Sequence, residues 1–335
     1  MSIHFAINGV GRIGRALLRI ANERPGLELV AVNDLGNAEQ LARLIARDSL
    51  HGSFDGDVRS EADSLIIDGR RIAAFEVDCP ADVPWDQTDA VVVVEATGRC
   101  LERDQAAGHL KGSVHTVLVS ANSPEMDITI CFGVNDAEYD RERHRLISGA
   151  SCTTNCLAPV ASVLHDSFGL TQGLVNTVHS YNNDQRLLEF PHPDPRRARA
   201  ATLNMIPTTT SAIQAVDRIL PQLAGRIDGI AIRVPTPNVS LIDLVARLES
   251  RPSIEDIATA FRSAADGPLA GVLAVTDEEL VSSDFMREPH SAIVDLPLLQ
   301  QVDGTLYRIV AWYDNEWGHA SRLADLLILT GRTDD

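Results

Sequence analysis

The chain has 335 residues, 44% of them hydrophobic and 23% charged, a composition typical of a globular protein with room for two domains. Its formal net charge of −18 disfavours nucleic acid or an anionic membrane as the main partner, and an anionic substrate would need a local positive pocket. Five cysteines, an odd number, do not resemble a disulfide framework, and the N-terminus shows no secretion signal, so we expect a cytoplasmic protein.

The first part of the chain alternates short apolar strands with helices. Strand patterns at 3–8 and 27–32 flank a helical pattern at 12–22, and a second helix is expected over 38–47. The further predicted strands are 64–67 and 71–75, joined by an Asp68-Gly69 hairpin turn, then 90–95 and 117–120. This alternation predicts an α/β fold with a Rossmann-type doubly wound parallel sheet, whose ligand lies at the carboxyl ends of the strands.

The pattern changes after residue 151. A helix over 152–167 precedes longer strand patterns at 174–179, 227–234, 239–248 and 306–312, and a last helical pattern covers 320–329. The polar stretch 180–200 is too long for a simple turn and is a candidate functional loop. We predict a first domain over 1–151, to which a C-terminal helix over 316–335 returns. The second domain, over 152–315, is expected to be α+β with a large mixed or antiparallel sheet.

A glycine-rich turn, Asn8-Gly9-Val10-Gly11-Arg12-Ile13-Gly14, joins the first strand to the first helix. Gly9 permits a tight turn, Gly11 lets the backbone approach a pyrophosphate, and Gly14 lets helix and strand pack closely. Asp34 follows twenty residues after Gly14, at the end of the next strand, where a carboxylate suits the ribose of NAD and repels the extra phosphate of NADP. The alternative is a glycine turn without a ligand. The context favours a domain that binds NAD.

Cys152 lies in Ser151-Cys152-Thr153-Thr154-Asn155-Cys156, at the predicted start of a helix. The helix N-terminus favours a thiolate, the reactive form of cysteine, and His179 at the end of the next strand is the obvious base. The alternatives are an inert buried cysteine and a structural histidine. Cys156, one turn further, has packing as its default role. The spacing gives no zinc site, and no metal is predicted.

Two groups of arginines are candidates for anion binding. Arg233 lies within an apolar strand and is either paired with a carboxylate or available to an anionic ligand. The cluster Arg196-Arg197-Ala198-Arg199 is either a salt-bridged surface or part of an anion site.

Over nearly its whole length the chain resembles the glyceraldehyde-3-phosphate dehydrogenase family. The segments that carry the resemblance are 7–15, 151–159, 177–181, 196–201 with 206–208, 233–236 and 312–316. The resemblance implies that Cys152 attacks an aldehyde to give a hemithioacetal, with His179 as general base and oxyanion ligand beside the backbone N–H of Cys152. Hydride then passes to NAD, and inorganic phosphate cleaves the thioacyl enzyme. The implied reaction is the phosphorylating oxidation of glyceraldehyde 3-phosphate to 1,3-bisphosphoglycerate.

The resemblance also implies the binding residues. Those expected to bind NAD are Asn8, Gly9, Gly11, Arg12, Ile13, Gly14, Asn33, Asp34, Thr97, Gly98, Ser120 and Asn315, the last of which would hold the nicotinamide carboxamide. Those expected to bind the substrate phosphate and inorganic phosphate are Ser151, Thr153, Asn182, Arg197, Thr210, Ser211 and Arg233. The family is typically a homotetramer, with the loop 180–200 reaching a neighbouring subunit.

Three positions depart from the usual family pattern: Asn182 stands for a threonine, Ser211 for a glycine, and His319 for a tyrosine near the nicotinamide. A sister enzyme, erythrose-4-phosphate dehydrogenase, uses the same cysteine and histidine but passes its acyl group to water. Segment 289–295 resembles that sister, whereas Tyr181, Pro191 and residues 208–210 are closer to the phosphorylating enzymes. The phosphorylating reaction is favoured over the sister activity. A non-catalytic NAD-binding redox sensor is a third possibility, since an activated cysteine oxidises readily.

Overall fold

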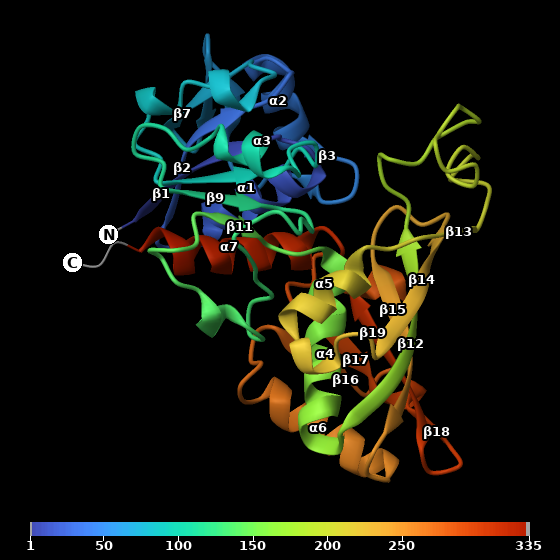
Figure 1. Ribbon diagram of the computed structural model, residues 1–335. Coiled ribbons are helices and arrows are strands. Elements are labelled where there is room, and N and C mark those ends of the chain that lie inside the picture. The colour runs from blue at the N-terminus through green and yellow to red at the C-terminus, as the bar shows by residue number, and fades with distance from the viewer. Residues whose placement is uncertain (1, 333–335) are drawn as a thin grey trace. The chain divides into compact units, whose positions relative to one another are not determined.

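The computed structural model describes residues 2–332 and divides into two compact units. The first unit comprises Met1–Ile130, Glu138–Ala150 and Ala320–Asp335, and the second comprises Cys131–Ala137 and Ser151–His319. Each unit is built around one large sheet, as Figure 1 shows. Length and apolar character together rule out a bilayer-spanning helix within residues 2–332.

The sheet of the first unit has nine strands among the described residues, in the order β10-β11-β9-β8-β1-β2-β7-β6-β5. Every pairing from β10 to β7 is parallel, and β5, β6 and β7 pair antiparallel at one edge. The strands are β1 (Ile3–Asn8), β2 (Leu27–Asn33), β5 (Val58–Ser60), β6 (Ser64–Ile67), β7 (Arg70–Phe75), β8 (Val92–Glu95), β9 (Thr116–Val119), β10 (Ile128–Thr129) and β11 (Leu146–Ser148). This is the predicted Rossmann-type sheet, confirmed.

Four helices belong to this unit among the described residues, and the first three of them lie in connections between its strands. They are α1 (Arg12–Glu23), α2 (Ala38–Ala46), α3 (Arg103–Ala107) and the part of α7 (Trp317–Gly331) that follows residue 319. The predicted hairpin turn has positive φ at both central residues, 48° at Asp68 and 80° at Gly69, as a two-residue hairpin requires. Short elements complete the chain: β3 (Arg47–Asp48), β4 (Gly52–Ser53) and 3-10 turns at Pro80–Asp82, Trp85–Gln87, Asp136–Glu138, Pro221–Leu223, Ser282–Phe285 and Leu296–Leu298.

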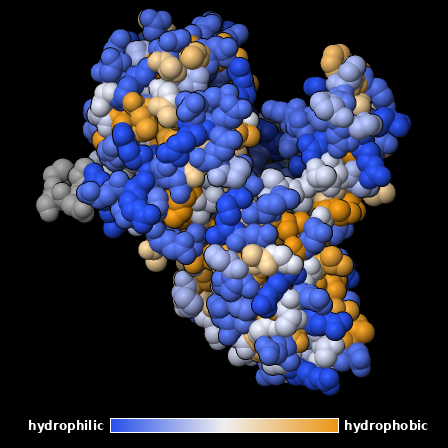
Figure 2. Space-filling view, viewed as in Figure 1, coloured by the Kyte–Doolittle hydropathy of each residue, from blue (hydrophilic) through white to orange (hydrophobic). Residues whose placement is uncertain are grey.

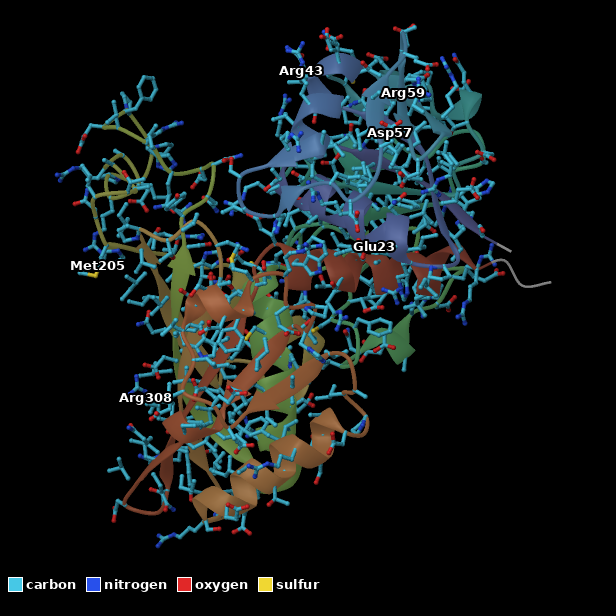
Figure 3. The ribbon with its side chains drawn as sticks, turned by 180° about the vertical axis from the view of Figure 1, so that it is seen from behind. Glu23, Arg43, Asp57, Arg59, Met205 and Arg308 are labelled. Carbon is cyan, nitrogen blue, oxygen red and sulfur yellow. The ribbon has the colours of Figure 1, made fainter. Side chains whose placement is uncertain are left out.

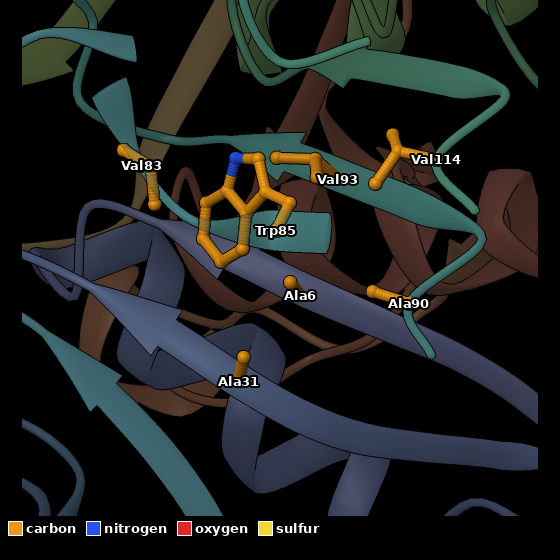
Figure 4. Packing of buried hydrophobic residues seen from close by; sticks show 7 residues of the cluster. All are labelled: Ala6, Ala31, Val83, Trp85, Ala90, Val93 and Val114. Carbon is orange, nitrogen blue, oxygen red and sulfur yellow. The ribbon is translucent and has the colours of Figure 1, made fainter. Parts of the chain in front are cut away.

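Trp85 anchors part of the core of the first unit. Its ring is fully buried among small and β-branched side chains, which Figure 4 shows as Ala6, Ala31, Val83, Ala90, Val93 and Val114. Alanines at the sheet positions leave room for the large indole, which alone buries roughly 150–250 Å² of surface. The strands beneath it are thereby fixed close to the glycine-rich turn that follows β1.

The second unit has an eight-stranded mixed sheet, in the order β13-β14-β12-β15-β19-β17-β16 with β18 paired to β19. The pairs β12–β14 and β16–β17 are parallel and the others are antiparallel. The strands are β12 (Leu170–Ser180), β13 (Ile206–Thr208), β14 (Ile227–Val234), β15 (Ser240–Leu248), β16 (Leu273–Thr276), β17 (Ala292–Asp295), β18 (Gln300–Val302) and β19 (Leu306–Tyr313). The predicted mixed sheet is confirmed.

Helix α4 (Cys152–Phe168) packs against β12, β15, β17 and β19, and α5 (Ala212–Ile219) and α6 (Ile254–Ala265) pack against α4. Figure 1 shows these helices on one face of the sheet. Alternation along β12 turns Val175, Thr177 and His179 to buried positions, while Leu174 is 66% exposed. The sheet therefore carries His179 on the face against which α4 packs.

Candidate active site

The glycine-rich turn of the first unit has the geometry of a pyrophosphate cradle. Gly9 has a φ of 95°, and a Cβ at Gly14 would lie 2.1 Å from the carbonyl oxygen of Gly9, so neither position accepts a side chain. A Cβ at Gly11 would meet nothing within 4 Å. Among the described residues no side chain caps the start of α1, and the N–H groups of a helix N-terminus suit an anion.

Asp34 lies directly beside this turn. One carboxylate oxygen accepts a hydrogen bond from Val10 N at 2.7 Å, and the other accepts from Leu35 N at 2.7 Å and Gly36 N at 3.2 Å. The carboxylate is thereby fixed at the carboxyl end of β2, the position at which the sequence predicts a contact with the ribose. Two more expected contacts, Thr97 and Gly98, follow β8, and Ser120 follows β9, at the same edge of the sheet.

The side-chain amides of Asn8 and Asn33 have partners within the protein. Asn33 donates to the side-chain oxygen of Asn8 at 2.7 Å and pairs with both backbone groups of Val77. Asn8 in turn donates to Glu95 at 2.5 Å. Both amides are buried and engaged within the protein, so they support the turn from beneath.

Glu95 is a buried carboxylate that sequence reasoning missed. It is 1% exposed. Trp85 Nε1 donates to His109 Nδ1 at 2.9 Å, so the other ring nitrogen, Nε2, is the donor to Glu95 at 3.1 Å. Burial raises the pKa of Glu95, but hydrogen bonds from His109, Thr97 and Asn8 lower it to a net value below the ordinary one. The charged carboxylate therefore fixes Thr97 and the turn after β8.

Cys152 is the first residue of α4, in the second unit. Ser151 is the N-cap, and its hydroxyl accepts from Thr154 N at 3.2 Å. Ala150, just before this cap, is buried with a φ of 60°, a left-handed conformation that costs a non-glycine residue about 1–3 kcal/mol. Strain next to a nucleophile is typical of active sites, and polar residues surround Cys152 as the sequence indicated.

The sulfur of Cys152 lies 3.5 Å from Nε2 of His179. Nδ1 of His179 lies 2.7 Å from the carbonyl oxygen of Ser180 and 2.5 Å from Nη1 of Arg233, which also donates to that oxygen at 2.9 Å. A guanidinium only donates, so the two contacts of Nδ1 require different tautomers. We assign the proton to Nδ1, since 2.7 Å suits N–H···O whereas 2.5 Å is too short for a bond between nitrogens. Nε2 then carries the lone pair that can accept the thiol proton.

Burial raises the pKa of the Cys152 thiol, whereas the charge of Arg233 and hydrogen bonds from the Thr153 side chain and the helix N-terminus lower it; the net pKa lies above the ordinary value. The helix N-terminus favours the thiolate, as expected, but it does not determine the net pKa. Desolvation outweighs the helix. The thiol needs a base in contact with it, and the base within reach is His179.

Asn315 follows β19 and has a fixed amide. Its side-chain oxygen accepts hydrogen bonds from Ser180 Oγ at 2.9 Å and Ser240 Oγ at 3.0 Å, while Ser240 Oγ accepts from Ser180 N at 3.1 Å. Two hydroxyl donors on one oxygen determine which end of the amide is which. The NH₂ group is left to donate to a ligand carbonyl, as the nicotinamide role requires.

Arg233 has no carboxylate partner within residues 2–332, which favours the anion-binding alternative. The N-terminus of α5 lies beside that of α4, because Thr154 Oγ1 donates to Ala212 O at 3.4 Å. Thr210 accepts from Ala212 N, and Ser211 is the exposed N-cap residue. Two helix N-termini and a cation thus converge where an anion would be stabilised.

Arg197 differs from Arg233. It forms ion pairs with Asp184 at 2.7 Å and Asp194 at 3.5 Å, and Arg199 pairs with Glu189. The arginine cluster is therefore salt-bridged, the first of the two alternatives. Asn182 belongs to the same loop, and its side-chain oxygen accepts a hydrogen bond from Asp184 N at 3.2 Å. Its NH₂ group is therefore the part of the amide that could donate to a phosphate.

His319 is buried, and its Nδ1 lies 3.4 Å from the amide of Asn155 on α4. Within residues 2–332 there is no group of three or more His, Cys, Asp or Glu side chains arranged to hold a metal ion. All five cysteines are free thiols.

The chain matches two family descriptions. Residues 3–103 match "Glyceraldehyde 3-phosphate dehydrogenase, NAD binding domain", and residues 151–315 match the C-terminal domain of that family. Among curated relatives, the glyceraldehyde-3-phosphate dehydrogenase of Geobacillus stearothermophilus is 47% identical over 97% of each chain. Glyceraldehyde-3-phosphate dehydrogenase 1 of Bacillus subtilis is 46% identical over 97% of each chain. The Mycolicibacterium smegmatis protein of the same name is 46% identical over 99% of this chain and 100% of its own.

Proposed function

Because the chain belongs to the glyceraldehyde-3-phosphate dehydrogenase family, we propose that it catalyses the NAD-dependent, phosphorylating oxidation of glyceraldehyde 3-phosphate to 1,3-bisphosphoglycerate. The observation that carries the proposal is the contact between Cys152 and His179, with 3.5 Å between sulfur and Nε2, at the N-terminus of α4. A thiol beside an imidazole acceptor is the arrangement that covalent aldehyde oxidation needs.

The chemistry of the chain's own residues follows from this geometry. His179 Nε2 takes the thiol proton of Cys152 while the sulfur bonds to the aldehyde carbon. The resulting oxyanion is stabilised by the helix N-terminus and by the protonated Nε2, which returns its proton to give the hemithioacetal. His179 accepts the hydroxyl proton again as the carbon is oxidised to a thioester. Inorganic phosphate then attacks that carbon, and the Cys152 thiolate leaves.

NAD, when bound, accepts the hydride that leaves the aldehyde carbon. The groups that suit NAD are the N–H groups at the start of α1, the carboxylate of Asp34, and the oriented NH₂ group of Asn315. The space above Gly11 supports the fit, since a side chain there would stand between backbone and phosphate. The negative charge of Asp34 favours NAD over NADP.

Arg233, Ser151, Thr210 and Ser211 support binding of the substrate phosphate and of inorganic phosphate near the N-termini of α4 and α5. We assign Arg233 as the principal cation, since Arg197 is already paired with Asp184. Asn182 and Arg197 would join an anion site after rearrangement of their ion pairs and turn contacts.

The relatives are named glyceraldehyde-3-phosphate dehydrogenase, which favours that reaction over the erythrose-4-phosphate activity. Steady-state rates with each aldehyde, with and without inorganic phosphate, separate the two. We expect phosphate-dependent turnover of glyceraldehyde 3-phosphate to dominate. Faster, phosphate-independent turnover of erythrose 4-phosphate would overturn the proposal, and NAD binding without oxidation of either aldehyde would instead favour the redox sensor.

We further propose that the two units are an NAD-binding domain and a catalytic domain, and that the protein is a cytoplasmic homotetramer. The loop after β12 supports assembly, because Leu187 and Leu188 are each 72% exposed and Phe190 is 63% exposed. Figure 2 shows apolar atoms on the surface of the second unit, and Met205 projects outward in Figure 3. Exposed apolar groups of this kind mark contact surfaces.

A further inference from the structure

A buried polar seam runs along the carboxyl edge of the sheet in the first unit. It consists of the last residues of three neighbouring strands, Glu95 of β8, Asn8 of β1 and Asn33 of β2. Asn8 is the register partner of both others, and the exposed fractions of the three are 1%, 4% and 3%. Thr97, the glycine-rich turn and Asp34 each follow one of these strand ends. The polar seam therefore joins the points from which the segments suited to NAD leave the sheet.

The carboxylate of Glu95 uses its acceptor capacity within the protein. One oxygen accepts from both the backbone N–H and the hydroxyl of Thr97, and the other accepts from Asn8 Nδ2 at 2.5 Å and His109 Nε2 at 3.1 Å. Four donors match the roughly four lone-pair sites of a carboxylate. Burial raises the pKa of Glu95 and these hydrogen bonds lower it to a net value below the ordinary one, so each partner faces a charged acceptor.

This carboxylate sets the direction of the hydrogen bonds across the next strands. Because Glu95 only accepts, Asn8 presents Nδ2 to it and Oδ1 to Asn33. Asn33 Nδ2 donates to that oxygen at 2.7 Å and to Val77 O at 2.8 Å, and its Oδ1 accepts from Val77 N at 3.0 Å. Reversal of a single amide would place two donors or two acceptors face to face. A charge on β8 thus fixes backbone that follows β7, three strands away in the sheet.

We propose that Glu95 is a positioning residue for NAD, whose carboxylate orients the polar seam and so pre-organises the cofactor-binding segments after β8, β1, β2 and β7. A side chain that is 1% exposed does not itself reach a bound cofactor, so its effect passes through Thr97 and Asn8. Preorganisation strengthens binding because less order has to be imposed when the ligand arrives. The inference rests on the proposed NAD-binding role of these segments.

The test is the affinity of the full-length protein for NAD, measured by calorimetry, together with steady-state oxidation of glyceraldehyde 3-phosphate at varied NAD. Glu95→Gln keeps the shape of the side chain but replaces one oxygen by an NH₂ group, which must face two donors. We expect its Kd for NAD to rise about tenfold, and its Kd for ADP-ribose, which lacks the nicotinamide, to rise by the same factor. The value of kcat at saturating NAD should stay within about twofold of the wild type, because Cys152 and His179 lie in the other unit.

A double variant tests whether the effect travels along the polar seam. Asn33→Asp alone turns an oxygen toward two acceptors, Asn8 Oδ1 and Val77 O, and should also raise the Kd about tenfold. In Glu95→Gln/Asn33→Asp the amide of Asn8 can reverse, accept from the new glutamine and donate to the new aspartate. The double variant should then raise the Kd about tenfold, rather than the roughly hundredfold of independent effects. Independent effects would contradict the polar seam.

Asp127→Asn is the matched control. Asp127 accepts from Arg145 N and Leu146 N at 2.8 Å each, but at the amino ends of β10 and β11, so the Kd for NAD should equal that of the wild type. His109→Leu removes one donor without changing the carboxylate. It should raise the Kd about threefold, which keeps the test decisive if Glu95→Gln does not fold.

A wild-type Kd in Glu95→Gln or, where that variant does not fold, in His109→Leu would overturn the positioning role. A lower kcat at saturating NAD with an unchanged Kd would do the same. A wild-type protein that bound no NAD would instead refute the proposed function.

Discussion

At the scale of single residues, the site depends on how Cys152 loses its proton. Burial opposes the thiolate, and Arg233, the helix N-terminus and the Thr153 hydroxyl favour it without fully compensating. The imidazole of His179 makes deprotonation possible by accepting the thiol proton. Its Nδ1–H donates to Ser180 O, and its Nε2 faces the sulfur. Catalysis then rests on a proton transfer across one short contact.

His179→Asn is expected to lower turnover by ~10²–10⁴-fold, since it removes the general base. Without that base the remaining activity should rise steadily with pH, because the thiol pKa is raised and thiolate forms only as the pH approaches it. Initial rates of NADH formation across pH 6 to 10 measure both effects. His165→Asn, near the end of α4, is the control and should match the wild type. A variant at His179 with an unchanged rate would refute the assignment.

Ser240→Ala is expected to weaken NAD binding about fivefold, because the amide of Asn315 loses one of the two hydroxyls that orient it. A loosened amide should also let the nicotinamide ring turn over, so deuterium from a labelled aldehyde would appear on both faces of the product. Calorimetry and NMR of the reduced cofactor measure these outcomes. Ser250→Ala, just beyond β15, serves as control. Unchanged affinity together with single-face transfer would show that Ser240 does not orient Asn315.

At the scale of elements, the sequence predicted well which helix or strand carries each candidate site residue. It predicted less well which other residues each of them contacts. The predicted β1 and β14 have the observed bounds, because their apolar runs end at polar or proline residues. Helix α6 was missed although Ser253 and Asp256 form a capping box before an apolar face. The strands β16 and β17 have four residues each, too few to show a period.

The contacts that complete the site join residues far apart in the chain. Glu95 with His109, Ser240 with Asn315, and Tyr313 with Thr153 are set by strand order and register. Local spacing carries no signal for such pairs. The unusual backbone of Val239, a buried β-branched residue with a φ of 63°, likewise could not be predicted from the sequence. The resemblance supplied roles for several residues, and the structure supplied the partners.

An ion pair between α1 and β3 gives a pH-dependent stability. Asp48 is 8% exposed and binds Arg15 at 3.0 Å. Burial raises the pKa of Asp48, but hydrogen bonds from His51 N and Leu50 N and from Arg15 lower it to about 2, against 3.8 for the free group. A depressed carboxyl pKa stabilises the fold above the unfolded-state pKa, and that stability is lost as the pH falls through the folded-state pKa.

Asp48→Asn should therefore lower the free energy of unfolding by about 2 kcal/mol at pH 7, and by progressively less as the pH falls from about 4 toward 2. Urea unfolding at several pH values measures the difference. Asp57→Asn is the control, since Asp57 is 66% exposed and pairs with Arg59, which is 55% exposed; both residues are labelled in Figure 3. If Asp48→Asn lowered the free energy of unfolding by the same amount at acidic pH as at pH 7, the proposed link between stability and the ionisation of Asp48 would be contradicted.

At the scale of the whole molecule, the net charge of −18 makes two copies of the chain repel each other. Self-association therefore has to be driven by apolar contacts. The side chains of Leu187, Leu188 and Phe190 project from the loop after β12 and would be costly to leave in water. The proposed homotetramer gives them an interface.

Leu188→Asp is expected to shift the assembly from tetramer toward smaller species, because a carboxylate would be buried at the interface without a partner. Light scattering after size exclusion, at several protein concentrations, measures the mass. Leu44→Asp on α2, where the leucine is 49% exposed, should leave the mass unchanged. Equal masses for both variants and the wild type would place the interface elsewhere.

The central claim is that Cys152 carries the acyl group until phosphate removes it. Rapid mixing of enzyme, NAD and glyceraldehyde 3-phosphate without phosphate should give a burst of one NADH per Cys152, with the acyl adduct visible on the Cys152 peptide. Added phosphate should convert the burst into continuous turnover and discharge the adduct. Continuous turnover without phosphate, or a burst that survives Cys152→Ser, would contradict the account.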